Sequence, residues 1–191
     1  MDLPSWVSAD EDKPAPMPLL RVQAFVNTLD VDQGSDLLRA DEAASAWLAD
    51  AGLVAPGTAV SDEQLHMARE VREAIRALLR RNSGTGCPDS DQLRTLQTLA
   101  EGHSPAVGVK PDGTVSLAVR VGADLCDGLL GLLLTIRDAQ ADGTWSRLKL
   151  CANPECDWAF YDGSRNRQGA WCTMSACGNR LKNRRFRARQ R

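Results

Sequence analysis

Four of the six cysteines in this 191-residue chain form two pairs near its end, Cys151-x4-Cys156 and Cys172-x4-Cys177, with fifteen residues between the pairs. Zinc takes four soft or borderline ligands in a tetrahedron, and two short loops that each deliver two thiolates provide such a set. A segment this short cannot bury a core of its own, so the metal would stabilise its fold. We therefore predict one structural Zn2+ held by these four cysteines. Disulfides and an iron–sulfur cluster are the alternatives.

The charges are divided unevenly along the chain. Residues 1–146 carry 12 Lys and Arg against 22 Asp and Glu, whereas residues 147–191 carry 11 against 3, so a segment of net charge −10 precedes one of +8. A basic arm commonly binds a polyanion, although a solvated basic helix would have the same composition. Arg outnumbers Lys by 19 to 4, and arginine is well suited to bidentate contacts with phosphate and guanine.

No segment of the chain is typical of a membrane span or a secretory signal. The longest apolar run, residues 129–136, is interrupted by Gly131 and is far shorter than the roughly 20 residues that cross a bilayer. The first 18 residues are acidic and contain four prolines, without a basic start or an apolar stretch. We therefore expect a cytoplasmic protein with no membrane partner, and we interpret residues 1–18 as a flexible tail.

Residues 19–146 predict a small mixed body of the α+β class, with about three strands and four helices. Ser61 with Gln64, and Asp89 with Gln92, are capping-box patterns that indicate helix starts. The predicted helices cover residues 41–52, 61–81, 89–99 and 124–141. Alternating apolar residues predict a strand over 19–30 and a hairpin over 107–121 around a Pro-Asp-Gly turn.

Residues 147–191 predict a small module around the metal. Residues 157–161 and 168–171 flank a turn and could pair as a hairpin, with Trp158, Phe160 and Trp171 packed beside the zinc. After Cys177 the chain has no proline and many helix formers. This order of knuckle, hairpin and basic C-terminal helix indicates a treble-clef-like finger.

The residues of this module resemble the CGNR zinc-finger family, whose motif stands here as Cys177-Gly178-Asn179-Arg180, preceded by FYDGSRNRQGAWC at 160–172. Residues 168–170 depart from the family pattern, in which a basic residue is expected before Trp-Cys. The body, with FVNTLD at 25–30, resembles the ABATE-like domain found ahead of this finger in bacterial transcription regulators. The resemblance implies a regulator whose body (19–146) senses a ligand and whose finger (147–191) binds DNA.

From this resemblance we expect a set of basic side chains to contact DNA. They are Arg165, Arg167, Arg180, Lys182, Arg184, Arg185, Arg187, Arg189 and Arg191. Arg180, directly after the last ligand, could instead brace the finger, with Asp162 as a partner. Asn27 and Thr28 are candidate ligand-binding residues, or they cap the chain at a turn. A homodimer and nucleoid association are further expectations, because a single short finger usually needs a partner to reach specific affinity.

Other classes of function are less well supported by the sequence. His66 and His103 show no nucleophile–base spacing, and no phosphate-binding loop lies near them, so we do not expect an enzyme. Cys87 and Cys126 are interpreted as a loop thiol and a core residue. The main alternative is a protein-interaction adaptor whose basic helix docks on an acidic partner. The acidic body itself is one such surface, which would make the protein autoinhibited.

Overall fold

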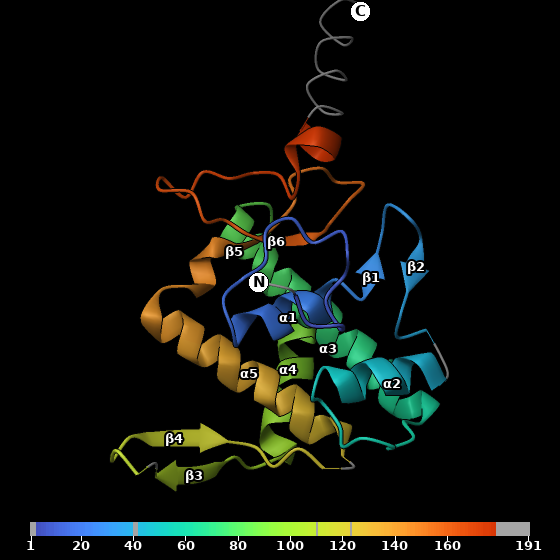
Figure 1. Cartoon of the computed structure of the whole chain (residues 1–191), viewed down its shortest axis with the longest axis vertical. Coiled ribbons are helices and arrows are strands. Elements are labelled where there is room, and N and C mark those ends of the chain that lie inside the picture. The colour runs from blue at the N-terminus through green and yellow to red at the C-terminus, as the bar shows by residue number, and fades with distance from the viewer. Residues whose placement is uncertain (1–2, 40–41, 110, 123, 179–191) are drawn as a thin grey trace, which may run out of the picture.

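The computed structural model describes residues 3–39, 42–109, 111–122 and 124–178 (Figure 1). Within them lie five α-helices: α1 (Leu19–Val26), α2 (Glu42–Asp50), α3 (Asp62–Ser83), α4 (Ser90–Gly102) and α5 (Leu125–Asp142). Three two-stranded antiparallel sheets pair β1 (Leu29–Asp30) with β2 (Ser35–Asp36), β3 (Ala106–Val109) with β4 (Val115–Ala118), and β5 (Leu148–Leu150) with β6 (Ala159–Tyr161). A 3-10 turn (Trp145–Arg147) and a π-helical turn (Met174–Gly178) complete the elements. The predicted α+β class is confirmed.

Side-chain caps fix the ends of the longer helices. Both predicted capping boxes are present, since Gln64 N donates to Ser61 Oγ and Gln92 N donates to Asp89 Oδ1. Helix α5 begins after Asp124, whose carboxylate accepts from Cys126 N. It ends at Gly143, which has φ 79° and adopts the left-handed conformation that glycine allows. Local sequence signals thus set these boundaries.

The core lies between α1, α3 and α5. Phe25, Ile75 and Leu129, one from each helix, have no solvent exposure. The three helices cross the middle of the molecule, with β5 and β6 at one end and the β3–β4 hairpin at the other (Figure 1). Because all three helices contribute fully buried apolar side chains, they form the platform on which the cysteine-rich module rests.

The predicted strand over residues 19–30 is wrong: residues 19–26 form helix α1. Only Leu29 and Asp30 pair as strand β1. Seven of the eight residues of α1 are buried, so polar residues do not mark out a solvent face. A short apolar segment of this kind has no informative period, and its helical state depends on tertiary packing.

Residues 3–18 differ from the free tail expected from their composition. Glu11 and Ala15 are buried, Trp6 O accepts from Trp47 Nε1, and Lys13 O accepts from Tyr161 N. The segment therefore crosses both the body and the cysteine-rich module. Among the described helices, none has both the length and the apolar composition that a membrane span requires.

Candidate metal centre

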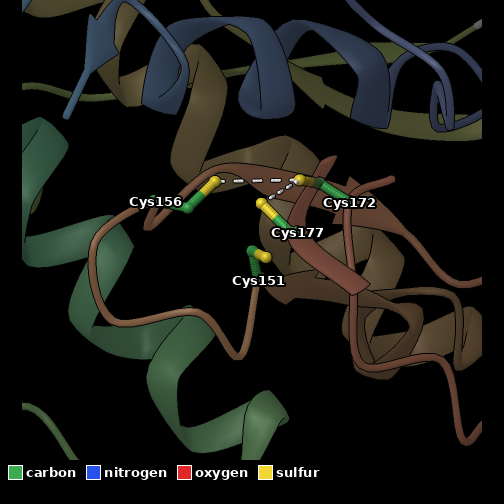
Figure 2. Close-up of side chains that lie close together, drawn as sticks. All are labelled: Cys151, Cys156, Cys172 and Cys177. Carbon is green, nitrogen blue, oxygen red and sulfur yellow. Dashed lines mark hydrogen bonds between the residues drawn. The ribbon is translucent and has the colours of Figure 1, made fainter. Parts of the chain in front are cut away.

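The four predicted ligands come together at one point from two short segments, residues 151–156 and 172–177 (Figure 2). Cys151 directly follows β5, Cys156 lies in the loop before β6, Cys172 precedes the π-helical turn, and Cys177 lies within it. Their sulfur atoms lie within 4.8 Å of one another, and all four residues are buried. The chain thus brings together cysteines up to 26 positions apart in a closed site.

The sulfur geometry fits a zinc ion. Cys156 Sγ and Cys177 Sγ each lie 3.7 Å from Cys172 Sγ. Zinc–sulfur bonds of about 2.3 Å in a tetrahedron place neighbouring sulfurs about 3.8 Å apart. The cysteines are free thiols in this structure, so disulfides are not formed between them. With four cysteine ligands and no open position, the centre is a single structural zinc site.

The electrostatics of the cluster suit a cation. Hydrogen bonding to Cys151 raises the pKa values of Cys156 and Cys172. The pKa of Cys151 is lowered because Cys156 and Cys172 donate to its sulfur. Four negatively charged thiolates this close together would repel one another without a cation between them. A central Zn2+ would neutralise half of their charge and displace the protons.

Aromatic side chains shield the cluster as predicted. Phe160 is fully buried against the cysteines, and Trp158 and Trp171 pack around them. The hairpin pairing is different from the prediction, however: 157–161 does not pair with 168–171, because β6 pairs with β5. A hydrogen bond from Ala152 N to Ala170 O links the later segment to the knuckle. Strand β5 is three residues long, too short to be recognised from its sequence.

Asp162 organises the loop that follows β6. Its carboxylate is buried and accepts hydrogen bonds from Lys149 Nζ (2.8 Å), Ser164 N and Oγ, and Gly169 N (2.7 Å). Burial alone would raise its pKa, but Lys149, Ser164 and Gly169 together hold it well below the ordinary value. A Cβ at Gly169 would lie 2.7 Å from this carboxylate, so a glycine is required there. Asp162 therefore fixes the loop over 163–169.

Arg165 and Arg167, two of the predicted DNA contacts, are exposed on this loop. Two basic residues hold the backbone of this loop. Arg147 Nη1 donates to the carbonyls of Asp162 and Ser164, and Lys149 Nζ donates to the carbonyl of Arg167. The other predicted DNA contacts lie outside the described residues. They are Arg180, Lys182, Arg184, Arg185, Arg187, Arg189 and Arg191.

Asn27 connects the body to the metal module. Its side chain donates to Ala159 O (2.9 Å) and accepts from Ala159 N (2.8 Å), so it pairs with β6 as a strand residue would. Asn27 also donates to Glu11 Oε2, which accepts in addition from Trp158 Nε1. Burial raises the pKa of Glu11 despite these hydrogen bonds. The sequence offered Asn27 as a ligand-binding residue or as a cap at a turn. It did not reveal this contact, which joins residues 132 positions apart.

Thr28 is buried beside Asn27, and both line a half-open cavity of about 260 Å3. Thr28 Oγ1 donates to Phe25 O and accepts from Arg72 Nη1, whose guanidinium also binds both carboxylate oxygens of Asp36. The polar atoms of the two predicted ligand-binding residues are thus engaged within the protein.

The two histidines and two remaining cysteines lie outside the finger. His66 is exposed on α3 and near Glu70, and Cys87 is exposed. Burial, together with the charge of Asp124, raises the pKa of Cys126 to about 11, so this cysteine is a thiol rather than an activated nucleophile.

The fold and the cysteine site together define a zinc-finger protein with a helical body. The CGNR zinc finger family matches residues 147–190. The ABATE family, described as "Putative stress-induced transcription regulator", matches residues 21–141, which is more than half of the chain. The chain belongs to this family. Among curated proteins, none matches the sequence.

Proposed function

We propose that this protein is a DNA-binding bacterial transcription regulator, in which the finger contacts DNA and the body responds to an effector. The observation that carries the proposal is the loop over 163–169, which presents the exposed Arg165 and Arg167 on a backbone fixed by Asp162. A rigid loop positions guanidinium groups for phosphate or base contacts at little entropic cost.

The charge distribution supports the same function. Residues 147–191 carry a net charge of +8, and a zinc ion with four thiolates leaves about +6. On this proposal, the basic residues from Arg180 to Arg191 extend the contact along the DNA. A regulator of this kind acts at the nucleoid in the cytoplasm, and a homodimer would double the contacted length.

The effector part of the proposal concerns the body. Asn27 and Thr28 line the 260 Å3 cavity, but their polar atoms are bonded internally, so they shape its wall and an effector would use other groups. Because Asn27 also holds β6, a ligand that displaced the neighbouring residues would act directly on the finger. A thermal-shift screen of small metabolites tests this part.

DNA binding of the zinc-loaded full chain, measured on a random-sequence duplex at two salt concentrations, tests the main proposal. We expect salt-sensitive binding, and a salt slope reduced by about 2 in an Arg165→Ala/Arg167→Ala variant, because each lost phosphate contact removes about one unit. Arg94→Ala/Arg137→Ala makes the same charge change on the body and should bind like the wild type.

A second variant, Arg184→Ala/Arg185→Ala/Arg187→Ala, tests the C-terminal segment, with its zinc content verified. If the wild-type protein, fully loaded with zinc, binds no DNA, the proposal fails. The adaptor that docks its basic segment on an acidic partner protein would then be the better interpretation.

A further inference from the structure

A second cluster of metal-ligating side chains lies in the body, in the part of the chain remote from the finger cysteines. His103, Asp124 and Cys126 place their ligand atoms within 4.8 Å of one another. The Met67 thioether lies 3.2 Å from Cys126 Sγ. These residues come from α3, the end of α4 and the start of α5, so they meet only in the folded body.

Both ring nitrogens of His103 face oxygen atoms. Nδ1 lies 3.4 Å from Leu99 O, and Nε2 lies 3.3 Å from Asp124 Oδ2. A neutral imidazole has one N–H and cannot donate to both oxygens. A metal-binding histidine commonly donates one ring N–H to a backbone carbonyl, which leaves the other nitrogen free to coordinate. The Leu99 carbonyl occupies the former position, and Nε2 faces the Asp124 carboxylate.

The spacing also suits a metal. An ion with bonds of about 2.0–2.3 Å to nitrogen, oxygen and sulfur separates its ligand atoms by about 3.3–3.8 Å. The distance between His103 Nε2 and Asp124 Oδ2 is within this range. The other ligand atoms lie within 4.8 Å of one another, so small side-chain movements would bring them to the same spacing. Asp124 uses its other oxygen to cap α5, which fixes the carboxylate.

The cluster lies on the wall of a largely apolar cavity of about 470 Å3, which His103, Cys126 and Met67 line together with residues of α3 and α4. Two of the three proposed ligands, His103 and Cys126, thus face the cavity, which leaves room there for a further ligand, as in metal sites that bind a small molecule.

We propose that His103, Asp124 and Cys126, with the Met67 sulfur beside them, form a second metal site for a thiophilic divalent ion of the zinc class. Thiolate and imidazole ligands favour Zn2+ over Mg2+ or Ca2+, which prefer oxygen. The site is separate from the structural zinc of the finger and does not depend on DNA binding.

Cobalt(II) serves as the probe, because a thiolate bound to Co2+ gives a charge-transfer absorption. The protein used is the full chain carrying Cys87→Ser, which removes the exposed thiol, with the finger loaded with zinc and one zinc ion per chain verified. We expect a second metal ion per chain to bind, with a thiolate-to-cobalt band and no loss of finger zinc. Cys126→Ser should lose the band, and His103→Ala should weaken cobalt binding at least tenfold.

Asp124→Asn and Asp127→Asn form a matched pair of variants. The Asp124→Asn side chain can still cap α5 but is a poorer metal ligand, whereas Asp127 lies in the first turn of α5 outside the cluster. Only the former should weaken cobalt binding, and circular dichroism checks the fold of each variant. Absence of the band in the Cys87→Ser protein, or a band that persists in Cys126→Ser, would overturn the proposal.

Discussion

A single carboxylate, that of Asp162, determines the shape of the loop proposed to contact DNA. It is buried, yet it accepts from two side chains and two backbone amides. A buried charge is tolerated only when it is paired and hydrogen bonded, and here Lys149 provides the opposite charge. The loss of the carboxylate would leave the Lys149 ammonium, which is 12 % exposed, without its partner.

We predict that Asp162→Asn lowers the free energy of unfolding by about 2–4 kcal/mol at neutral pH, because an amide replaces a charged acceptor. The folded-state pKa is lowered, so the stability from this group is present above the ordinary value of 3.8 and is lost as pH falls through the folded pKa. The difference in unfolding free energy between the wild type and Asp162→Asn should therefore become smaller below about pH 4. Urea unfolding across this pH range measures it.

Asp138→Asn removes an exposed carboxylate, paired on the surface with Arg137, and is the control. It should change stability by less than about 1 kcal/mol. A difference between Asp162→Asn and wild type that stayed constant down to pH 2 would contradict the assigned role of the carboxylate.

At the scale of elements, the approach of α5 to the loop after α2 depends on one glycine. A Cβ at Gly128 would lie 1.9 Å from Leu53 O and 2.7 Å from its carbonyl carbon. These are backbone atoms, which cannot rotate away as a side chain could. Helix α5 therefore has a residue of poor helix propensity at a place where it packs directly against backbone.

We predict that Gly128→Ala destabilises the protein by at least about 3 kcal/mol, since overpacking against backbone exceeds the gain in helix propensity. The melting temperature measures this effect. Gly102→Ala, at the end of α4 with no atom within 4 Å of the added Cβ, is the matched control and should be neutral or stabilising. Similar melting temperatures for the two variants would show that α5 can shift away from Leu53.

The elements differ in how far their sequences predict them. Helices α3 and α4 were predictable because Ser61 and Asp89 carry local capping signals. The helical state of α1 was not, because packing covers nearly all of its sides. The finger ligands were predictable because paired cysteines have few other uses in a chain of this kind. The cluster of His103 and Cys126 was missed because no characteristic spacing relates its members, which only the packing of α3, α4 and α5 brings together.

At the scale of the whole molecule, strands β5 and β6 pack into the main core of the body, whereas the cysteines form a separate cluster with the aromatic side chains around them. Leu148, Leu150 and Ala159 of β5 and β6 belong to the main core, whereas Phe160 belongs to the cysteine cluster. Asn82 Nδ2 and Ser83 Oγ of α3 also donate to carbonyls of the β5 region. The strands thus remain with the body, and the segments that carry the cysteines depend on zinc.

We predict that chelation of the finger zinc unfolds the cysteine-bearing loops and leaves the five described helices of the body folded. The fluorescence of Trp158 and Trp171 should shift to the red, while far-ultraviolet circular dichroism changes little. The zinc should also be released more readily as pH falls, since protons compete for the thiolates. Loss of most helical signal on chelation would instead show that finger and body unfold as one unit.

Lys13, in the N-terminal segment, contacts both the body and the finger. Its carbonyl accepts from Tyr161 N and Gln23 Nε2, and its ammonium donates to Trp171 O and lies 4.9 Å from the centre of the Phe160 ring. The side chain therefore joins the segment before Cys172 to the aromatic residue that covers the cysteines. The backbone contacts hold the segment to the body independently of the side chain.

We predict that Lys13→Met accelerates zinc release to a chelator about 5- to 30-fold, corresponding to about 1–2 kcal/mol for a charged hydrogen bond and a cation–π contact. The thermal stability of the body should be unchanged, because the backbone hydrogen bonds of residue 13 persist. Lys13→Arg retains the cation and should release zinc at close to the wild-type rate. If Lys13→Met and wild type released zinc equally fast, the N-terminal segment would be packed on the finger without stabilising its metal site.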